Sequence, residues 1–231
     1  DFLLPGKNNP CCLILPGGGY SKKAWDHEGI EIAEWLNKIG ISALVLDYRI
    51  SPYGGDAYVA DAQQAIRQIR SRAEEFGIDL NRLGICGFSA GGHLAGYCAT
   101  MYDDPALRPD FAILCYAVLS LKQGETHEGT ARNFLRTYGD AEENRKLHSP
   151  VQHVTNDCPP MFLWTTAGDK TVPPMPNTFA MHEACRKAGV PARMEYYDHG
   201  SHGLGIPKND PVIASWTVAC EEWLKELKII D

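Results

Sequence analysis

The stretch Gly87-Phe88-Ser89-Ala90-Gly91-Gly92-His93 decides the fold of this chain. It follows the apolar run Leu83–Cys86 and precedes a helical pattern of small residues. Strand, sharp turn and helix in this order are the context that a G-x-S-x-G motif requires. Gly87 and Gly91 remove Cβ atoms where such a turn brings neighbouring elements close together. We therefore predict a strained turn that presents the hydroxyl of Ser89 at the carboxyl end of a buried strand, where it can act as a nucleophile.

Apolar and β-branched runs alternate with helical patterns along the rest of the chain. The predicted strands are Cys11–Leu15, Ser42–Asp47, Leu83–Phe88, Phe111–Ala117, Met161–Thr166 and Ala192–Tyr197. The predicted helices are His27–Ile39, Ala57–Phe76, Ala90–Thr100, Asn177–Ala188 and Val212–Leu227. Each helix places apolar residues at helical spacing or is small and apolar throughout. This alternation indicates an α/β fold in which helices cover both faces of a mostly parallel sheet.

One stretch, Ser120–Pro160, interrupts the alternation and carries no strong strand signal. Two short helices are predicted in it, near Thr130–Tyr138 and Ala141–Leu147. An insertion between strands often forms a small lid or a substrate wall, although simple packing on the surface explains it equally well. Because no repeat, linker or low-complexity tract divides the chain, we predict a single domain over residues 1–231.

Composition and charge exclude several classes of function. The 231 residues carry a net charge of −7 and are 44% hydrophobic, which is typical of a globular protein. Basic residues do not cluster, so binding to nucleic acids or to anionic membranes is disfavoured. No apolar run approaches the roughly 18 residues of a membrane-spanning helix. We therefore expect a small-molecule partner rather than a nucleic acid or a membrane.

The cysteines and the first residues bear on the expected compartment. The eight cysteines lack metal-binding spacing, and several lie in apolar runs. A chain of this size does not need a disulfide scaffold, so we predict free, buried thiols and a cytoplasmic location. The chain opens at Asp1 with neither Met nor a signal peptide, which suggests processing or truncation. A secreted or periplasmic location therefore stays open.

A glycine-rich loop, Pro16-Gly17-Gly18-Gly19-Tyr20, follows the first predicted strand. A nucleotide-binding loop would continue with Lys and Ser or Thr, and this one does not. It could be a plain turn, but beside a nucleophilic serine it is better interpreted as half of an oxyanion hole. One donor would be the backbone N–H of Ala90, and the other that of Gly18 or Gly19. From their positions in loops, Tyr20, Trp25 and Tyr53 are predicted to border the substrate pocket.

A nucleophilic serine needs a base, and the base needs an acid that orients it. In open α/β sheets these groups lie on loops after later strands, at the carboxyl edge. Asp169 follows the fifth predicted strand and is our candidate acid, with a turn or helix-cap aspartate as the alternative. After the sixth strand, two histidines compete for the role of base, and we favour His202 over His199. The order Ser89, Asp169, His202 is the one expected for this type of site.

The remaining polar residues receive structural interpretations. His93 follows the serine turn and is predicted to be structural. No histidine or cysteine has zinc-binding spacing, so neither a metal nor a cofactor is expected. Asp26 is interpreted as a helix N-cap and Glu28 as a favourable first-turn charge, with a substrate-side role as the alternative. Asp61 on the long helix is predicted to form an ion pair.

Together these motifs resemble the α/β-hydrolase superfamily. They are most similar to the small bacterial acetyl esterase/lipase type, which is related to acetylxylan esterases. Asp47-Tyr48-Arg49-Ile50-Ser51-Pro52 and Ala60-Asp61-Ala62-Gln63 are further matches, and the resemblance covers nearly the whole chain. Pro16 stands where the hormone-sensitive-lipase-like branch has His, which argues against that branch. The fold usually has about eight strands with the glycine loop after the third. The resemblance therefore implies a minimal core of about six strands, or a core trimmed at its N-terminus.

The resemblance implies a cofactor-free serine esterase that removes short acyl groups, including acetyl groups of plant-wall sugars. In the expected mechanism, His202 activates Ser89, Asp169 orients His202, and water hydrolyses the acyl-enzyme. Two alternatives stay open. One is a peptidase or amidase with the same triad, although such enzymes usually carry an extra domain that restricts substrate entry. The other is a binding protein that has kept the fold after losing catalysis.

Overall fold

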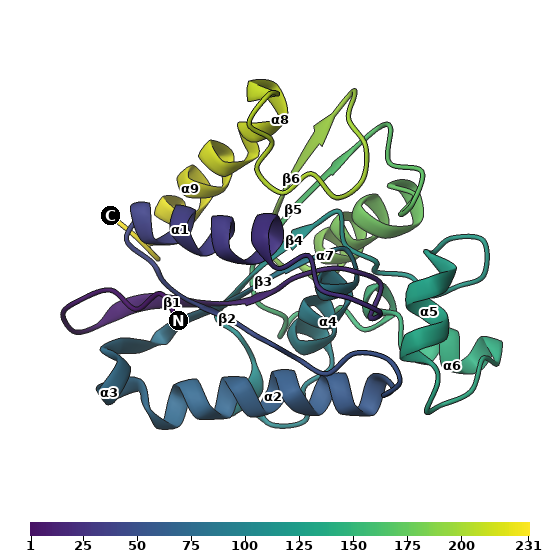
Figure 1. The fold of residues 1–231 in the computed structure, drawn as a ribbon, viewed down its shortest axis with the longest axis horizontal. Helices are drawn as coiled ribbons and strands as arrows, with labels where there is room; N and C mark the ends of the chain where they lie inside the picture. Colours follow the sequence, from purple (N-terminus) through teal and green to yellow (C-terminus); the bar gives the residue numbers. More distant parts are fainter.

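The computed structural model describes residues 1–231, and its centre is a six-stranded sheet in which all neighbouring strands are parallel. Along the sheet the order is β2-β1-β3-β4-β5-β6 (Figure 1). The strands are β1 (Asn9–Leu15), β2 (Ser42–Val45), β3 (Ile78–Phe88), β4 (Phe111–Cys115), β5 (Met161–Thr166) and β6 (Ala192–Tyr197). Since β2 lies on one side of β1 and β3 on the other, the strand order reverses between β1 and β3. Open α/β sheets bind ligands at such a reversal.

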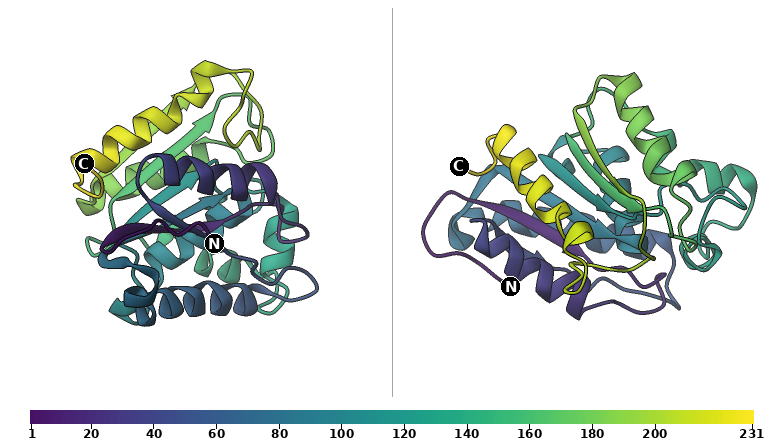
Figure 2. Two further views of the ribbon diagram at one scale, coloured as in Figure 1. Left: turned by 60° about the vertical axis from the view of Figure 1, so that its left-hand side comes forward. Right: turned by 90° about the horizontal axis from the view of Figure 1, so that it is seen from above.

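Helices cover both faces of the sheet, as the alternation in the sequence predicts (Figures 1 and 2). One face carries α1 (Glu31–Lys38) and α9 (Trp216–Glu226), with the short α8 (Pro211–Ala214) before α9. The opposite face carries α2 (Gly55–Ser71), α4 (Ser89–Thr100) and α7 (Ala180–Ala188). The shorter helices are α3 (Ala73–Phe76), α5 (Glu128–Phe134) and α6 (Glu142–Leu147). The result is the three-layer α/β architecture expected from the sequence.

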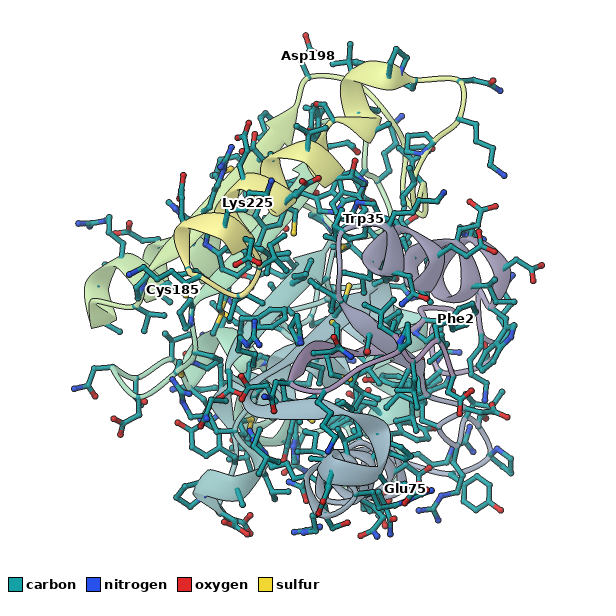
Figure 3. The ribbon with its side chains drawn as sticks, turned by 90° about the vertical axis from the view of Figure 1, so that its left-hand side faces the viewer. Phe2, Trp35, Glu75, Cys185, Asp198 and Lys225 are labelled. Carbon is teal, nitrogen blue, oxygen red and sulfur yellow. The ribbon has the colours of Figure 1, made fainter.

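Two apolar clusters hold the layers together, one on each face of the sheet. In β1, Leu13 belongs to the cluster that includes α2, α4 and α7, whereas Ile14 belongs to the cluster of α1 and α9. This alternation follows from the two-residue period of a strand. Burying one such Leu or Ile side chain stabilises the fold by about 1.5 to 3 kcal/mol. On the second face, Trp35 of α1 (labelled in Figure 3) packs against Trp216 of α9 with ring centroids 5.0 Å apart.

The predicted elements are all present, with differences at their ends. β5 and β6 have the predicted bounds. β3 begins at Ile78, five residues before the predicted start, because its first residues pair with Asn9 across an irregularity in the register. The predicted helix Ala57–Phe76 is two helices that meet at Arg72, and the second ends at the left-handed Gly77. Asp26 does not cap a helix, because it is the first residue of a π-helical turn that has no side-chain cap.

The segment Ser120–Pro160 contains both predicted short helices, α5 and α6, and a 3₁₀ turn at Pro150–Gln152. Phe134 at the end of α5 anchors it in the interior. Its ring centroid lies 4.5 Å from that of His93 on α4 and 6.2 Å from that of Tyr58 on α2. These contacts place α5 beside the first turns of α4, and therefore beside Ser89.

The eight cysteines are all buried, and their thiols are free. Burial raises the pKa of the Cys98 thiol to about 12, so this thiol is protonated at neutral pH. The helices are too short or too polar for any of them to cross a membrane.

Candidate active site

Ser89 lies on a strained turn between β3 and α4. Its φ is 53°, in the left-handed region that side chains with a Cβ rarely adopt. Two glycines make the turn sterically feasible. A Cβ on Gly87 would collide with the carbonyl oxygen of Gly91, and a Cβ on Gly91 would collide with that of Leu15. The turn thus directs the side chain of Ser89 away from the sheet and toward a cleft that this residue lines.

Asp169 and His202 come from separate loops and meet at Ser89. The Nε2 atom of His202 lies 2.8 Å from the Oγ atom of Ser89, and its Nδ1 atom lies 2.7 Å from Oδ2 of Asp169. Because a carboxylate only accepts hydrogen bonds, the proton of the neutral ring lies on Nδ1. Nε2 is then left to accept the hydroxyl proton of Ser89. The structure therefore joins the three residues in one hydrogen-bonded chain.

The carboxylate of Asp169 is held in place from its other side. Its Oδ1 atom accepts hydrogen bonds from the backbone amides of Thr171 at 2.9 Å and Val172 at 2.8 Å. The side chain is fully buried, so water does not screen its interaction with His202. These bonds keep the loop after β5 folded back over the sheet edge. Asp169 thus forms the backbone contacts of a turn aspartate, which was the alternative interpretation, and it also contacts His202.

The glycine loop after β1 lies directly beside the serine turn. A Cβ on Gly17 would lie only 2.9 Å from the Cβ of Ser89, so only glycine allows this approach. The carbonyl of Gly18 accepts from the amide of Lys22, and the carbonyl of Gly19 accepts from the side chain of Asn133. The amides of Gly18 and Gly19, in contrast, donate no hydrogen bond within the chain. Both glycines line the cleft, so these amides are free for a ligand.

Ala90, the third predicted donor, is the second residue of α4. The first amides of a helix have no partner within the helix. They also lie at its positive end, which favours negative charge nearby. The start of α4 also lies against the strand end before the glycine loop, since a Cβ on Gly91 would collide with the carbonyl oxygens of Leu15 and Pro16.

A buried carboxylate that we predicted as a simple first-turn charge, Glu28, connects three of the loops. Its Oε2 atom accepts the amide of Gly17 at 2.8 Å, and its Oε1 atom accepts the hydroxyl of Tyr116 at 2.7 Å. The oxygen of Tyr116 in turn accepts the amide of Gly205 at 2.9 Å, three residues beyond His202. Glu28 is 2% exposed and borders the cleft. No local sequence signal distinguishes it from an ordinary exposed glutamate at the start of a helix.

The cleft beside Ser89 has a volume of about 340 Å³. Twelve residues line it, and only one of them is hydrophobic. Polar side chains such as those of Lys22, Thr171 and His127 form much of its wall. His127 comes from the segment Ser120–Pro160 and was not predicted as a site residue. The cleft is therefore suited to a small polar molecule.

The prediction that Tyr20 borders the pocket is wrong. Tyr20 is fully buried in the core, its φ is 58°, and it is not among the residues that line the cleft. The ring stacks on Tyr58 with centroids 4.5 Å apart. Its hydroxyl donates to Nδ1 of His93 at 2.8 Å, while Nε2 of His93 donates to the carbonyl of His148. Burial lowers the pKa of His93 to about 4, so His93 is a neutral structural residue, as predicted.

Trp25 and Tyr53 also lie outside the cleft. They are 36% and 51% exposed, and neither lines the cleft that contains Ser89. Tyr53 instead lies beside Arg49, whose guanidinium is 5.3 Å from the ring centroid. That same guanidinium pairs with Asp61 at 2.7 Å, so the predicted ion pair of Asp61 is present.

His199, the competing candidate base, does not contact Ser89. It lies between Asp198 and Asp210, at 2.7 and 2.8 Å, and these two carboxylates raise its pKa. Both ring nitrogens of His199 are thus hydrogen-bonded to carboxylates at the surface. Among the residues that the structure describes, no group of His, Cys, Asp and Glu side chains is arranged to hold a metal ion.

Comparison with known proteins agrees with this fold. A family described as alpha/beta hydrolase fold matches residues 12–205, a range that contains Ser89, Asp169 and His202. The chain belongs to this family.

Several relatives are named esterases or acetyl ester hydrolases. The chain is 36% identical over 208 residues to an acetylxylan esterase of Xylanibacter ruminicola, covering 89% of this chain and 43% of the relative. It superposes with a TM-score of 0.93 on the acetyl ester-xyloside bifunctional hydrolase of Caldicellulosiruptor lactoaceticus, with 38% identity, covering 100% of this chain and 88% of that one.

A more distant solved structure is a propionate-bound esterase of Thermogutta terrifontis, with a TM-score of 0.83 and 26% identity. That alignment covers 98% of this chain and 86% of the esterase. The chain spans only 34 to 48% of the length of the first curated relatives that it matches.

Proposed function

We propose that this protein is a serine carboxylesterase that hydrolyses short-chain acyl esters, chiefly acetyl esters, through an acyl-enzyme. The observation that carries the proposal is the hydrogen-bonded chain from Ser89 through His202 to Asp169 at the wall of an open cleft. Each member has the neighbour that its role requires. Ser89 has a base, the base has an orienting carboxylate, and the carboxylate is itself fixed by two backbone amides.

The reaction proceeds in two steps. The Oγ atom of Ser89 attacks the ester carbonyl while Nε2 of His202 takes its proton. Asp169 stabilises the imidazolium that forms, and His202 then gives the proton to the departing alkoxide. In the second step, His202 takes a proton from water, which attacks the acyl-enzyme, and then returns it to Ser89. The products are the carboxylic acid and the alcohol.

The oxyanion of each tetrahedral intermediate binds in the proposed oxyanion hole. We assign its donors as the amide of Ala90 together with that of Gly18 or Gly19. The free amides of the two glycines support this assignment, because their carbonyls are bonded and their N–H groups are not. Such a donor typically contributes about 3 to 4 kcal/mol of transition-state stabilisation.

For the substrate we propose an acetylated carbohydrate, such as an acetylated xylo-oligosaccharide. Eight of the twelve residues that line the cleft have polar side chains, and its one hydrophobic residue is Ala24, which supports this class over a lipid ester. The names of the acetylxylan esterase and of the acetyl ester-xyloside hydrolase point to the same class. The propionate-bound relative supports a short acyl group.

Replacing Ser89 by Ala tests the mechanism. Without the nucleophile, we expect kcat for phenyl acetate to fall about 10⁵-fold or more, because the residues of such a triad act as a unit. Initial rates measure the effect, and circular dichroism checks that the variant is folded. Ser71→Ala, on the surface of α2, is the matched control and should retain full activity. Activity of the Ser89 variant near the wild-type level would rule out the proposed mechanism.

A further inference from the structure

His127 brings an imidazole into the cleft that the proposed mechanism does not use. The residue lies just before α5 and lines the same cleft as Ser89 and His202. Its ring packs beside the glycine loop, since a Cβ on Gly19 would lie 3.4 Å from its Cε1 atom. The Nε2 atom of His127 makes no hydrogen bond within the chain, whereas its Nδ1 atom does.

The hydrogen bonds of Nδ1 determine which nitrogen of His127 carries the proton. Nδ1 accepts the backbone amide of Thr130 at 3.3 Å, and the hydroxyl of Thr130 lies 2.9 Å away. An amide N–H only donates, so the proton of the neutral ring lies on Nε2. Burial, and then the nearby His202, lower the pKa of His127, which keeps the ring neutral. The free Nε2–H group is therefore an unused hydrogen-bond donor on a residue that lines the cleft.

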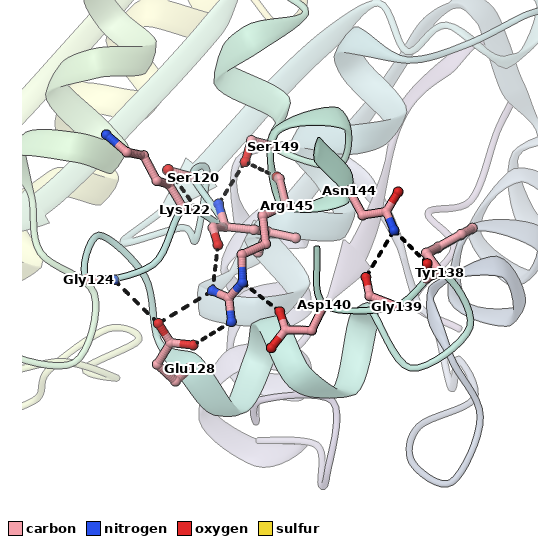
Figure 4. A network of polar contacts seen from close by, with 11 residues as sticks. Ser120, Lys122, Gly124, Glu128, Tyr138, Gly139, Asp140, Asn144, Arg145 and Ser149 are labelled. Carbon is pink, nitrogen blue, oxygen red and sulfur yellow. Dashed lines mark hydrogen bonds and ion pairs between the residues drawn. The ribbon is translucent and has the colours of Figure 1, made fainter. Parts of the chain in front are cut away.

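The backbone around His127 is rigidly held. Arg145 of α6 is buried and donates to Glu128, the first residue of α5, at 2.9 Å (Figure 4). The same guanidinium donates to the carboxylate of Asp140 at 2.6 Å and to the carbonyl of Leu121 at 2.9 Å. Figure 4 shows Arg145 between Glu128 and Asp140. The residue that follows His127 is thus tied to α6, so the donor is fixed before a substrate arrives.

We propose that His127 is a specificity residue whose Nε2–H group binds an oxygen on the alcohol part of the ester, such as a sugar hydroxyl beside the acylated position. The inference rests on the proposed esterase function and deepens it. In that mechanism His202 protonates the departing alkoxide, so the alcohol part lies next to His202. His202 and His127 both line the cleft that contains Ser89.

The chemical class of the ligand follows from the donor. A neutral imidazole N–H pairs with a hydroxyl or ether oxygen, and sugars and other polyols present several beside each ester. An aryl ester such as phenyl acetate presents none in its leaving group. His127 should therefore favour polyol esters without assisting the chemical step.

The test compares two substrates across variants of His127. In His127→Asn the side chain still caps α5 but no longer reaches the cleft. We expect kcat/KM for acetylated xylobiose to fall about tenfold, mostly through KM, because a substrate hydroxyl loses its partner. With phenyl acetate, kcat/KM should change less than about twofold, which also reports that the variant is folded. His127→Gln, with a longer amide donor, should recover part of the loss.

His182→Asn is the matched control, because His182 lies on α7 and does not line the cleft. An equal loss on both substrates would overturn the proposal, since it would assign His127 to the chemistry or to the fold. An unchanged kcat/KM on both, or a wild-type protein inactive on acetylated xylobiose, would overturn it as well. None of these results affects the Ser89 test with phenyl acetate, so a failure of this inference is distinguishable from a failure of the proposed function.

Discussion

At the scale of single residues, the site depends on a carboxylate that takes no part in the proposed chemistry. Glu28 accepts one hydrogen bond from the glycine loop and one from Tyr116, which in turn holds the loop of His202. A buried donor left without a partner costs about 1 to 3 kcal/mol. We therefore expect Glu28 to help hold the glycine loop in its orientation through the amide of Gly17. We regard Glu28 as a positioning residue.

Glu28→Leu should lower kcat for phenyl acetate about 10- to 100-fold with little change in KM, because the amide of Gly17 loses its acceptor and the loop relaxes. Glu28→Gln should recover part of the activity, since its amide oxygen can still accept from Gly17. Steady-state kinetics measures both effects. Glu31→Leu, one turn along and paired only with Lys208 on the surface, is the control. If Glu28→Leu raised KM and left kcat unchanged, Glu28 would bind substrate instead of positioning the loop.

Sequence and structure agree best for residues whose chemistry depends on order along the chain. Ser89, Asp169 and His202 each follow a strand of a parallel sheet, and the ends of such strands necessarily lie at one edge. Tyr20 was misjudged, and the burial of Glu28 was not foreseen, for a different reason. Whether a loop side chain turns outward or inward depends on φ and on neighbours distant in the sequence, such as His93 and Tyr116. No local pattern carries that information.

At the scale of elements, the segment Ser120–Pro160 is stabilised by an unusual polar anchor. Arg145 is 6% exposed, yet its partners Glu128 and Asp140 are partly open to solvent. Those carboxylates can be hydrated if Arg145 is lost, whereas the buried carbonyl of Leu121 cannot. The anchor should therefore contribute more than a surface ion pair and less than a fully buried one.

Arg145→Met keeps most of the side-chain volume and removes every hydrogen bond of the guanidinium. We expect the free energy of unfolding to fall by about 2 kcal/mol, measured by urea denaturation. Arg186→Met, which breaks an exposed pair with Glu183 on α7, should cost less than about 0.5 kcal/mol. Equal effects of the two substitutions would show that Arg145 behaves as a surface residue.

The predictability of elements also has a physical limit. β5 and β6 were predicted to the residue, because Pro, Gly or Asp flanks them closely. β3 was predicted too short, since its first residues are partly polar and are extended only because Asn9 pairs with Ile78. Similarly, α2 and α3 share one helical pattern, and the break at Arg72 is invisible in it. Tertiary contacts decide such boundaries.

At the scale of the whole molecule, the layers leave a small polar cleft of about 340 Å³ above the carboxyl edge of the sheet. Its walls belong to the glycine loop, to the loops after β5 and β6, and to His127. A long acyl chain gains affinity only by burying apolar surface, at about 0.8 kcal/mol for each buried methylene. The one hydrophobic residue of the lining is Ala24, so the cleft has no large apolar side chain against which a long acyl chain could pack.

Among aryl esters, we therefore expect kcat/KM to be highest for acetyl and propionyl groups and to fall at least about tenfold for octanoyl, because its extra methylenes find no apolar wall. A series of 4-nitrophenyl esters of increasing acyl length measures this dependence. Alanine 4-nitroanilide is the matched amide and should be hydrolysed far more slowly. A maximum at octanoyl, or faster hydrolysis of the amide, would contradict the proposed substrate class.

The parallel sheet has one more consequence. A crossover must join any two parallel strands, so each strand contact closes a long loop of chain. Ser89, the glycine loop, Asp169 and His202 follow four different strands, and Glu28 and Tyr116 tie three of the loops together across the sheet. A fragment of the chain therefore lacks part of this site, and so does a folding intermediate in which one of the loops is not docked. The proposed hydrolysis of a simple ester is therefore a reporter of completed folding, and it should return on refolding only with the last cooperative step.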